Sequence, residues 1–324
     1  MSVCAFVLTR DRKALLVECL RALLTQTHPV DRVIVLDNAS SDGTRERLEA
    51  EGLLDEPRVR YERREVNTGG AGGYHEGVRL ALESGEDWIW LMDDDAEPAP
   101  DALERLLTSP PAQDPATAVL CTSVVHPDGT VDLQHRCRMA RFIVPLGQDA
   151  YAPGRYADVA CASFVGFLVR ADVARRIDLP IAGFFLGYDD AEYSLRVLRH
   201  GRIRLVPESR IVHKIAIGGG AHTARSRRLN RALGLTYAPA SWPALWKDLY
   251  RVRNFMWIKR HHGRVGPLAF AGLTGGYVVK ALLYDPRPLR ELPWIVRFAA
   301  RGWRGDLSPS PTPQDWAQRA GVGR

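Results

Sequence analysis

The chain is 324 residues long, with 46% hydrophobic and 25% charged residues, which is ordinary for a soluble globular protein and excludes disorder as its main state. The 28 glycines and 21 prolines follow no strict repeat, so collagen-like and low-complexity classes are excluded as well. Five cysteines form no CxxC pair, which gives no indication of a zinc knuckle or disulfide scaffold and fits a reducing cytosol. The N-terminus lacks a basic region ahead of an apolar one, so we expect no signal peptide.

The net charge of +6 is divided unevenly along the chain. Residues 216–324 carry 18 Lys and Arg against 5 Asp and Glu, together with six of the eight tryptophans. The remaining 26 basic and 33 acidic residues give residues 1–215 a charge of −7. A basic region rich in aromatic residues is typical of contact with an anionic surface, either a membrane or a nucleic acid. We therefore expect the chemistry in the acidic part and a surface or partner contact in the basic part.

Strands and helices alternate through the acidic part, which predicts a mostly parallel α/β sheet with ligands at the carboxyl ends of its strands. The apolar runs predict strands over Val3–Leu8, Arg32–Asp37, Val59–Arg63, Trp88–Met92, Ala160–Val169 and Ile203–Val206. Helical periodicity predicts helices over Leu15–Leu24, Gly72–Leu82 and Ala191–Arg199.

The pattern becomes helical, basic and aromatic after the glycine run at 218–220. This change predicts a catalytic domain over residues 1–220 and a helical C-terminal region over residues 221–324, associated with the acceptor or with a membrane. Residues 265–284 form an apolar run long enough to span a membrane, but the run contains Lys280 and several glycines. A buried or surface-lying amphipathic helix is the alternative to a membrane span there.

Three consecutive aspartates, Asp93 to Asp95, follow the apolar segment WIWLM. Adjacent carboxylates repel one another unless a hard cation or solvent relieves the repulsion. Mg²⁺ and Mn²⁺ take oxygen ligands, and alternate residues of an extended segment point to the same side. Asp93 and Asp95 are therefore predicted to flank one divalent cation while Asp94 faces elsewhere. A solvated acidic turn before a helix is the alternative.

The glycine-rich segment Asn67–Gly73 reads NTGGAGG. It lacks the G-x-G-x-x-G spacing, and the first predicted strand-to-helix turn, residues 9–12, contains no glycine, so a dinucleotide-binding Rossmann site is excluded. A glycine-rich turn that opens a helix still suits a diphosphate or a sugar, because backbone N–H groups and the positive end of the helix dipole favour anions. A flexible connector is the alternative.

A second acidic segment, Asp189-Asp190-Ala191-Glu192, opens the last predicted helix of the acidic part. One carboxylate would suffice to cap that helix, whereas three within four positions beside aromatic residues favour a pocket floor with a general base for a hydroxyl. His213 lies just beyond the last predicted strand. It is either a packed residue or a nitrogen ligand that completes a mixed carboxylate–imidazole sphere suited to Mn²⁺.

Together these segments resemble the family 2 glycosyltransferases of the GT-A fold. The resemblance covers about residues 1–220 and is carried by the ordered motifs FVLTRDR, LDNASSDGT (Leu36–Thr44), NTGGAGG, WLMDDDAEP (Trp90–Pro98), GYDDAEYSLR (Gly187–Arg196) and VHK (Val212–Lys214). The glycine-rich block, the triple Asp, the DDAE segment and YRVRN (Tyr250–Asn254) are most similar to bacterial galactofuranosyltransferases and rhamnosyltransferases. The resemblance implies a mostly parallel nucleotide-sugar-binding sheet flanked by helices, followed by a basic, aromatic-rich helical region.

The resemblance also implies roles for individual residues. The nucleotide and the donor sugar would be bound by Thr9, Arg10, Asp37, Asn67, Gly69, Gly70 and Asp94. The cation, Mn²⁺ or Mg²⁺, would be bound by Asp93, Asp95 and His213. Asp190 would be the catalytic base, with Asp189 and Glu192 holding hydroxyls of the acceptor or the donor sugar. Many relatives have Tyr-Asn or Arg-Asn after the first Thr, whereas this chain has Arg10-Asp11.

We therefore expect a metal-dependent, inverting hexosyltransferase of cell-envelope polysaccharide synthesis. It would move galactofuranose or rhamnose from a UDP- or dTDP-linked donor to a hydroxyl of a glycan or lipid-linked glycan. A lipid-linked acceptor implies a cytoplasmic protein held peripherally at the inner membrane by anionic lipid, with no nucleic-acid partner. Two alternatives stay open: a metal-dependent phosphotransferase or nuclease with a two-metal site, and a non-catalytic membrane-binding module on the same fold.

Overall fold

The structure, a computed structural model, describes residues 1–139, 143–214, 228, 230, 241–263, 265–285, 288–312, 315, 316 and 318. The chain divides into two compact units. Unit 1 comprises Met1–Ala182 and Asp190–Ala216, and unit 2 comprises Gly183–Asp189 and Ile217–Arg324. The domain boundary predicted at residue 220 lies outside the described residues. The short segment Gly183–Asp189 belongs to the helical unit 2, although it interrupts the sequence of unit 1.

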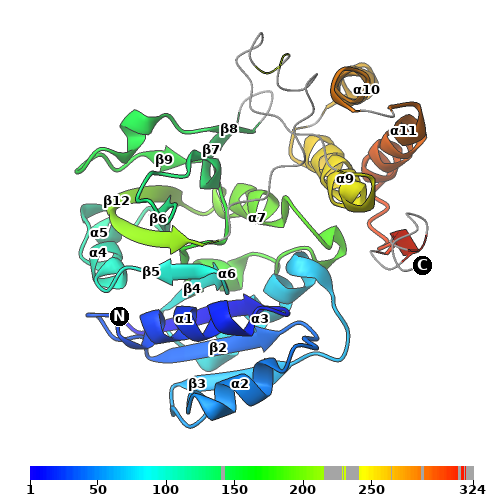
Figure 1. Cartoon of the computed structure of the whole chain (residues 1–324). Helices are drawn as coiled ribbons and strands as arrows, with labels where there is room; N and C mark the ends of the chain where they lie inside the picture. Colours follow the sequence, from blue (N-terminus) through cyan, green and yellow to red (C-terminus); the bar gives the residue numbers. More distant parts are fainter. Residues whose placement is uncertain are drawn as a thin grey trace. The chain divides into compact units, whose positions relative to one another are not determined.

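Unit 1 is built on one large sheet with the strand order β3-β2-β1-β4-β11-β6-β12-β5, and β9 pairs with β12 (Figure 1). The pairing is parallel from β3 to β4 and again between β6 and β12, whereas β11 is antiparallel to both of its neighbours. These strands are β1 (Val3–Thr9), β2 (Arg32–Asp37), β3 (Val59–Arg63), β4 (Trp88–Asp93), β5 (Ala96–Pro98), β6 (Thr117–Val125), β9 (Asp158–Val159), β11 (Phe167–Arg170) and β12 (Arg202–His213).

The helices of unit 1 follow the strands, as the alternation in the sequence predicts. They are α1 (Lys13–Leu24), α2 (Thr44–Ala50), α3 (Gly69–Ser84), α4 (Ala102–Leu107), α5 (Pro110–Gln113), α6 (Ala171–Arg176) and α7 (Asp189–Val197, whose first residue belongs to unit 2). A small antiparallel sheet contains β10 (Cys161–Ala162), β7 (Arg136–Met139) and β8 (Ile143–Pro145). The 3-10 helices are η1 (Leu133–His135), η2 (Gln148–Tyr151), η3 (Ala182–Phe184) and η4 (Trp242–Ala244).

The large sheet is apolar on both faces. Successive side chains of each central strand point to opposite sides, and in these strands nearly all of them are apolar. In β4, Trp90 and Met92 pack into one hydrophobic cluster, while Ile89 and Leu91 pack into the other. All five cysteines are buried and none forms a disulfide. The near-continuous apolar runs that predict these strands are therefore the signature of a sheet covered on both sides.

Helix α3 approaches the sheet closely because it is rich in glycine. A Cβ atom at Gly77 would lie 2.1 Å from the ring of Phe6, and one at Gly73 would lie 2.4 Å from Leu8, both on β1. The helix already begins at Gly69, three residues before the predicted start. The glycine-rich segment is therefore mostly the first turns of a tightly packed helix and not a flexible connector.

The described part of unit 2 contains η4 and the longer helices α9 (Leu245–His261), α10 (Pro267–Tyr284) and α11 (Pro288–Arg304) (Figure 1). Their core is aromatic: Tyr250, Phe298 and Trp316 are fully buried in it, together with Leu249. Within the described part of the chain, α10 is the one helix long and apolar enough to cross a membrane, although core helices of soluble proteins meet the same criterion. Only 22% of its apolar stretch is buried.

A cavity of about 140 Å³ lies between the helices of unit 2 and is lined by ionisable side chains. Its walls include Asp248, Lys280, Asp285 and Glu291, with Tyr188 from the segment Gly183–Asp189. Glu291 is 4% exposed, and burial followed by the proximity of Asp285 raises the pKa of Glu291 to about 8. One carboxyl group of this pair is therefore protonated near neutral pH.

Candidate active site at the carboxyl edge of the sheet

Strand register brings most of the predicted site residues to one edge of the sheet. Thr9 at the end of β1 is paired with Asp37 at the end of β2. On the other side of β1, Leu8 is paired with Asp93 at the end of β4. His213 ends β12, where its antiparallel partner on β5 is Ala96, just after the three aspartates. These positions are far apart in sequence, and the parallel pairing of β1, β2 and β4 together with the antiparallel pairing of β12 and β5 gathers them.

The predicted cation ligands meet in space. Asp93, Asp95 and His213 each offer a ligand atom, and these atoms lie within 4.8 Å of one another. Nε2 of His213 is 3.3 Å from Oδ1 of Asp95, and the Tyr74 hydroxyl donates to Oδ1 of Asp93 at 2.6 Å. Nδ1 of His213 is buried and has no hydrogen-bond partner. Two carboxylates and one imidazole form a donor set that fits Mn²⁺ or Mg²⁺.

The electrostatics of this cluster are those of a cation site. Burial, followed by the charge of Asp95, raises the pKa of Asp93. Burial acts in the same direction on Asp95, but the contact with His213 outweighs it and lowers the pKa of Asp95. Burial alone would lower the pKa of His213, whereas Asp95 raises it. A positive charge placed among these groups would therefore be stabilised.

Asp94 faces Thr9 and Arg10, although Asp94 and Asp95 form the turn between β4 and β5 and not the extended segment that the sequence predicts. Its Oδ2 accepts from the Thr9 hydroxyl at 2.8 Å and from the backbone N–H of Arg10 at 3.3 Å. Arg12 donates to Asp94 at 3.1 Å and to Asp95 at 2.9 Å. Burial raises the pKa of Asp94 to about 6, against the opposing effect of Arg12. Thr9 thus orients an aspartate in this structure.

Arg12 places its guanidinium at the acidic cluster, although no sequence motif marks it. The resemblance to family 2 glycosyltransferases implies a diphosphate contact for Arg10, but the guanidinium of Arg10 lies 3.4 Å from Asp11. The only signal in the sequence is that TRDR holds two arginines at the end of a strand. Which of them turns toward the aspartates depends on backbone direction, since Asp11 adopts a positive φ of 52°.

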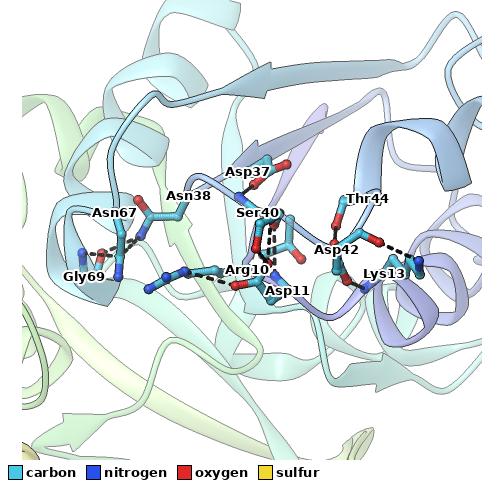
Figure 2. Close-up of polar contacts among 12 residues, drawn as sticks. Arg10, Asp11, Lys13, Asp37, Asn38, Ser40, Asp42, Thr44, Asn67 and Gly69 are labelled. Carbon is cyan, nitrogen blue, oxygen red and sulfur yellow. Dashed lines mark hydrogen bonds and ion pairs between the residues drawn. The ribbon is translucent and has the colours of Figure 1, made fainter. Parts of the chain in front are cut away.

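The loop after β2 forms the neighbouring part of the edge (Figure 2). Asp37 is 1% exposed, and its carboxylate accepts from the Ser40 N–H at 2.7 Å and the Tyr61 hydroxyl at 2.5 Å. The Asp11 N–H donates to the Ser40 hydroxyl at 2.9 Å, which links the loops after β1 and β2. Asp37 therefore shapes the loop, and its oxygens already carry two internal hydrogen bonds.

Asn38, another residue that the sequence analysis did not single out, ties this loop to the start of α3. Its side-chain amide donates to Oδ1 of Asn67 at 3.1 Å and to the carbonyl of Gly69 at 3.0 Å, as Figure 2 shows. Oδ1 of Asn67 also accepts from the Gly69 N–H at 2.9 Å. Gly69 has a φ of +73°, and a Cβ at Gly70 would meet no atom within 4 Å. The backbone at Gly70 is therefore open to a ligand.

The DDAE segment forms the first turn of α7. Asp190 is half-buried, and burial, with an added effect from the charge of Asp93, raises the pKa of Asp190 to about 6. Glu192 is 1% exposed, and both of its carboxylate oxygens accept from Arg196, at 2.8 to 3.0 Å. Arg196 also donates to the carbonyl of Leu179 at 3.2 Å. Glu192 thereby fastens α7 to the preceding loop.

The segment that leads into Asp190 is held by helix α9 within unit 2. The side-chain amide of Asn254 donates to the carbonyls of Phe184 at 2.9 Å, Leu186 at 3.1 Å and Gly187 at 2.8 Å. Arg253 adds bonds to the carbonyls of Gly183 at 2.7 Å and Phe184 at 3.0 Å. The YRVRN motif therefore fixes the conformation of the loop that ends at the acidic segment.

Comparison with solved structures agrees with this architecture. The chain superposes with a TM-score of 0.59 on GalNAc-T7, solved with UDP, GalNAc and Mn²⁺, at 14% identity over 80% of this chain and 48% of that one. It superposes with a TM-score of 0.53 on the mannosyltransferase PcManGT from Pyrobaculum calidifontis, solved with GDP-Man and Mn²⁺, at 19% identity over 93% of this chain and 86% of that one. These likenesses confirm the GT-A fold that the sequence predicts.

Sequence comparison is more specific. The chain is 32% identical to the galactofuranosyltransferase GlfT1 of Mycolicibacterium smegmatis over 204 residues, which are 61% of this chain and 66% of that protein. It is also 32% identical to GlfT1 of Mycobacterium tuberculosis over 211 residues, again 66% of the relative. The matched part is thus slightly less than two thirds of each relative. The sequence profile of glycosyl transferase family 2 matches residues 4–178, more than half of the chain, and the chain therefore belongs to that family.

Proposed function

We propose that the protein is a metal-dependent, inverting glycosyltransferase that moves galactofuranose from a UDP-linked donor to a hydroxyl of a glycan or lipid-linked glycan. The observation that carries the proposal is that Asp93, Asp95 and His213 lie together at the carboxyl edge of the sheet. Asp190 lies close enough for the charge of Asp93 to raise its pKa. The similarity to galactofuranosyltransferases supports galactofuranose over rhamnose as the donor sugar.

Asp93, Asp95 and His213 would hold Mn²⁺ or Mg²⁺, and the bound ion would act as a Lewis acid that neutralises charge on the departing diphosphate. Arg12 lies beside the same carboxylates and offers a guanidinium for the diphosphate oxygens. Thr9 and the backbone at Arg10 keep Asp94 in place near the donor. The open backbone at Gly70, at the start of α3, would contact the donor, whereas Gly69 is buried and its N–H and carbonyl are bonded to Asn67 and Asn38.

Asp190 would take the proton from the acceptor hydroxyl as the acceptor oxygen attacks the anomeric carbon. Its raised pKa of about 6 makes it a better proton acceptor than an ordinary aspartate, and it is still ionised at neutral pH. A single displacement of this kind inverts the anomeric centre. Asp189, which is 7% exposed at the start of α7, would orient the sugar hydroxyl. We assign Glu192 to holding α7 and no longer to sugar binding, because Arg196 occupies its oxygens.

Unit 2 would face a membrane that carries the acceptor. Leu268 is 91% exposed on α10, and Leu289 is 80% exposed on α11. Basic side chains accompany these apolar ones, for example Arg290 and Arg297, which lie over tryptophan rings. Exposed leucines with tryptophan and arginine are the combination that associates peripherally with anionic lipid. This supports a cytoplasmic protein bound to the inner face of the membrane.

The proposal is tested by incubating the full-length protein with labelled UDP-galactofuranose or dTDP-rhamnose and a lipid-linked glycan acceptor. We expect transfer from UDP-galactofuranose that stops on EDTA treatment and returns with Mn²⁺. Asp95→Ala should abolish this transfer without loss of folded structure, since the residue lies beyond the end of β4. Asp101→Ala is the control, because this aspartate pairs with Arg105 on the surface. Cation-dependent cleavage of nucleic acid without sugar transfer would overturn the proposal in favour of a nuclease.

A further inference from the structure

A second group of potential metal ligands adjoins the first in unit 1. Asp132, His135 and His213 each offer a ligand atom, and these atoms lie within 4.8 Å of one another. All three side chains are 4 to 5% exposed. His126 lies beside the group but outside it, with its Nε2 3.9 Å from Oδ2 of Asp132. Only His213 is shared with the set formed by Asp93 and Asp95.

The fold explains why these residues meet. β6 and β12 are parallel, with Val125 paired to Val212, so that His126 and His213 follow at the same edge of the sheet. The chain then turns back, since the His126 N–H donates to the carbonyl of Thr130 at 2.8 Å. Asp132 caps the 3-10 helix η1 with its Oδ1, which accepts from the Gln134 N–H at 3.0 Å. Its other oxygen is left to face the histidines.

The contacts within the group resemble those of metal ligands more than those of a hydrogen-bonded pair. Nε2 of His135 is 3.3 Å from Oδ2 of Asp132, yet it is buried and makes no hydrogen bond. Two ligands of a tetrahedral ion, each at about 2.0–2.1 Å from it, are separated by about 3.3 Å. Nδ1 of His135 lies 2.7 Å from the Ser163 hydroxyl, which fixes the ring as outer partners of ligating histidines do.

We propose that Asp132, His135 and His213 form a second cation site, with the chemistry that takes Zn²⁺. Two imidazoles and one carboxylate are a donor set of zinc sites, whereas two carboxylates and one imidazole suit Mn²⁺ or Mg²⁺. The side chain of His126 is 34% exposed, which gives an ion a way in from solvent.

The two sites exclude each other because they share His213. A neutral imidazole has one nitrogen lone pair for a cation, since its other nitrogen carries the proton. Zn²⁺ held by His135 and His213 therefore leaves Asp93 and Asp95 without their imidazole. Nitrogen-rich sites bind Zn²⁺ more tightly than Mn²⁺. Zn²⁺ should accordingly inhibit a Mn²⁺-supported reaction. This inhibition rests on the proposed function, whereas the binding of Zn²⁺ at the second site does not depend on it.

The binding experiment uses the full-length, metal-free protein with Co²⁺ as a spectroscopic probe and Zn²⁺ as its competitor. We expect the visible absorption of low-coordinate Co²⁺ in the wild type, its displacement by Zn²⁺, and at least about tenfold weaker Zn²⁺ binding in His135→Gln and in Asp132→Asn. Asp132→Asn serves as the second variant in case His135 is needed for folding, because an amide oxygen can still accept the bond that caps η1. Asp93→Asn is the matched control, because it removes a ligand of the first site only.

The activity experiment then separates the two claims. Zn²⁺ should lower Mn²⁺-supported transfer by the wild type at least about tenfold, and His135→Gln should keep its Mn²⁺-supported rate while losing this sensitivity. Equal Zn²⁺ binding by the wild type, His135→Gln and Asp132→Asn would overturn the site, as would the absence of a low-coordinate Co²⁺ spectrum. Binding as expected without any sugar transfer would leave the site in place and count against the proposed function alone.

Discussion

Three consecutive aspartates have three different environments in this protein. Asp93 receives a hydrogen bond from Tyr74, Asp94 from Thr9 and Arg12, and Asp95 faces His213. Their pKa values diverge accordingly, raised for Asp93 and Asp94 and lowered for Asp95. The contacts of each aspartate, and not the residue type they share, therefore determine its protonation and its availability to a cation.

Asp190 offers the clearest test at this scale. Asp190→Asn keeps the size of the side chain but cannot accept a proton, so kcat should fall by about 10²-fold or more. Affinity for the donor should change little, because the substitution leaves the ligands of the cation untouched. Steady-state kinetics with titration of the donor separates the two quantities.

Asp101→Asn provides the matched control for this experiment, since Asp101 is a partly exposed residue of unit 1 that pairs with Arg105. If Asp190→Asn weakens donor binding and spares kcat, the residue is a sugar contact and another group is the base.

The sequence predicts residues that act through a local pattern and misses those that act through the fold. Asp93, Asp95 and His213 stand at the ends of apolar strands, which marks them as candidates. Arg12 and Asn38 carry no such mark, because their roles depend on the direction of a turn and on a neighbouring loop. Asp132 and His135 carry no such mark either, because they come from a turn beside β6.

The distance between helix α3 and strand β1 depends on the absence of a side chain at Gly77. Gly77→Ala would place a Cβ atom 2.1 Å from the ring of Phe6, so the helix must move away from the sheet. We expect a loss of about 1–3 kcal/mol in the free energy of unfolding, measured by urea denaturation. Gly70→Ala, in the same helix, is the control, since a Cβ there meets nothing within 4 Å. Equal stability of the two variants would show that α3 is not fixed by this contact.

Helices α10 and α11 bound the cavity that holds Glu291, and this predicts a pH dependence. The pKa of Glu291 rises from 4.5 to about 8, so the folded state binds a proton that the unfolded state releases between these values. The contribution of Glu291 to the free energy of unfolding should therefore be greatest below about pH 4.5. It should fall as the pH rises toward 8. Glu291→Gln imitates the protonated form and should remove this decline.

The measurement is the melting temperature of both proteins between pH 5 and pH 8.5. At the upper end Glu291→Gln should melt higher by roughly 2 °C or more, and the difference should shrink toward pH 5. Glu83→Gln is the control, because this glutamate is exposed and paired on the surface of α3. Parallel pH curves for Glu291→Gln and the wild type would mean that Glu291 is ionised in the folded protein.

Sequence periodicity predicts the elements of unit 1 better than their pairing. Strands β1, β2 and β4 are continuous apolar runs and are found where expected. The run Ala160–Val169 predicts one strand, whereas the structure has β10 and β11 in two different sheets, with β11 antiparallel to its neighbours. Hydrophobicity reports burial, but strand direction is decided by the connections and not by composition.

The whole molecule combines an acidic α/β unit with a basic helical one. If unit 2 meets anionic lipid, the double variant Leu268→Asp with Leu289→Asp should lose co-sedimentation with anionic liposomes, because it places charge at two of the most exposed leucines. Association of the wild type should weaken at ~0.5 M salt, where the Debye length is well below its physiological ~8 Å.

Val66→Asp is the matched control, since Val66 is 66% exposed in unit 1. Equal sedimentation of the double variant, the control and the wild type would exclude these helices from the membrane contact.

The bonds from Asn254 to the loop before Asp190 have a consequence for building chimaeric enzymes. A hybrid that joins unit 1 of one parent to the helices of another at a single crossover near residue 217 would take Gly187 and Arg251 from different parents. A Cβ at Gly187 would lie 2.9 Å from Arg251, so a parent with a larger residue there would clash. Residues 183–189 must therefore be inherited with the helices, and exchange of the whole of unit 2 between relatives requires three crossovers.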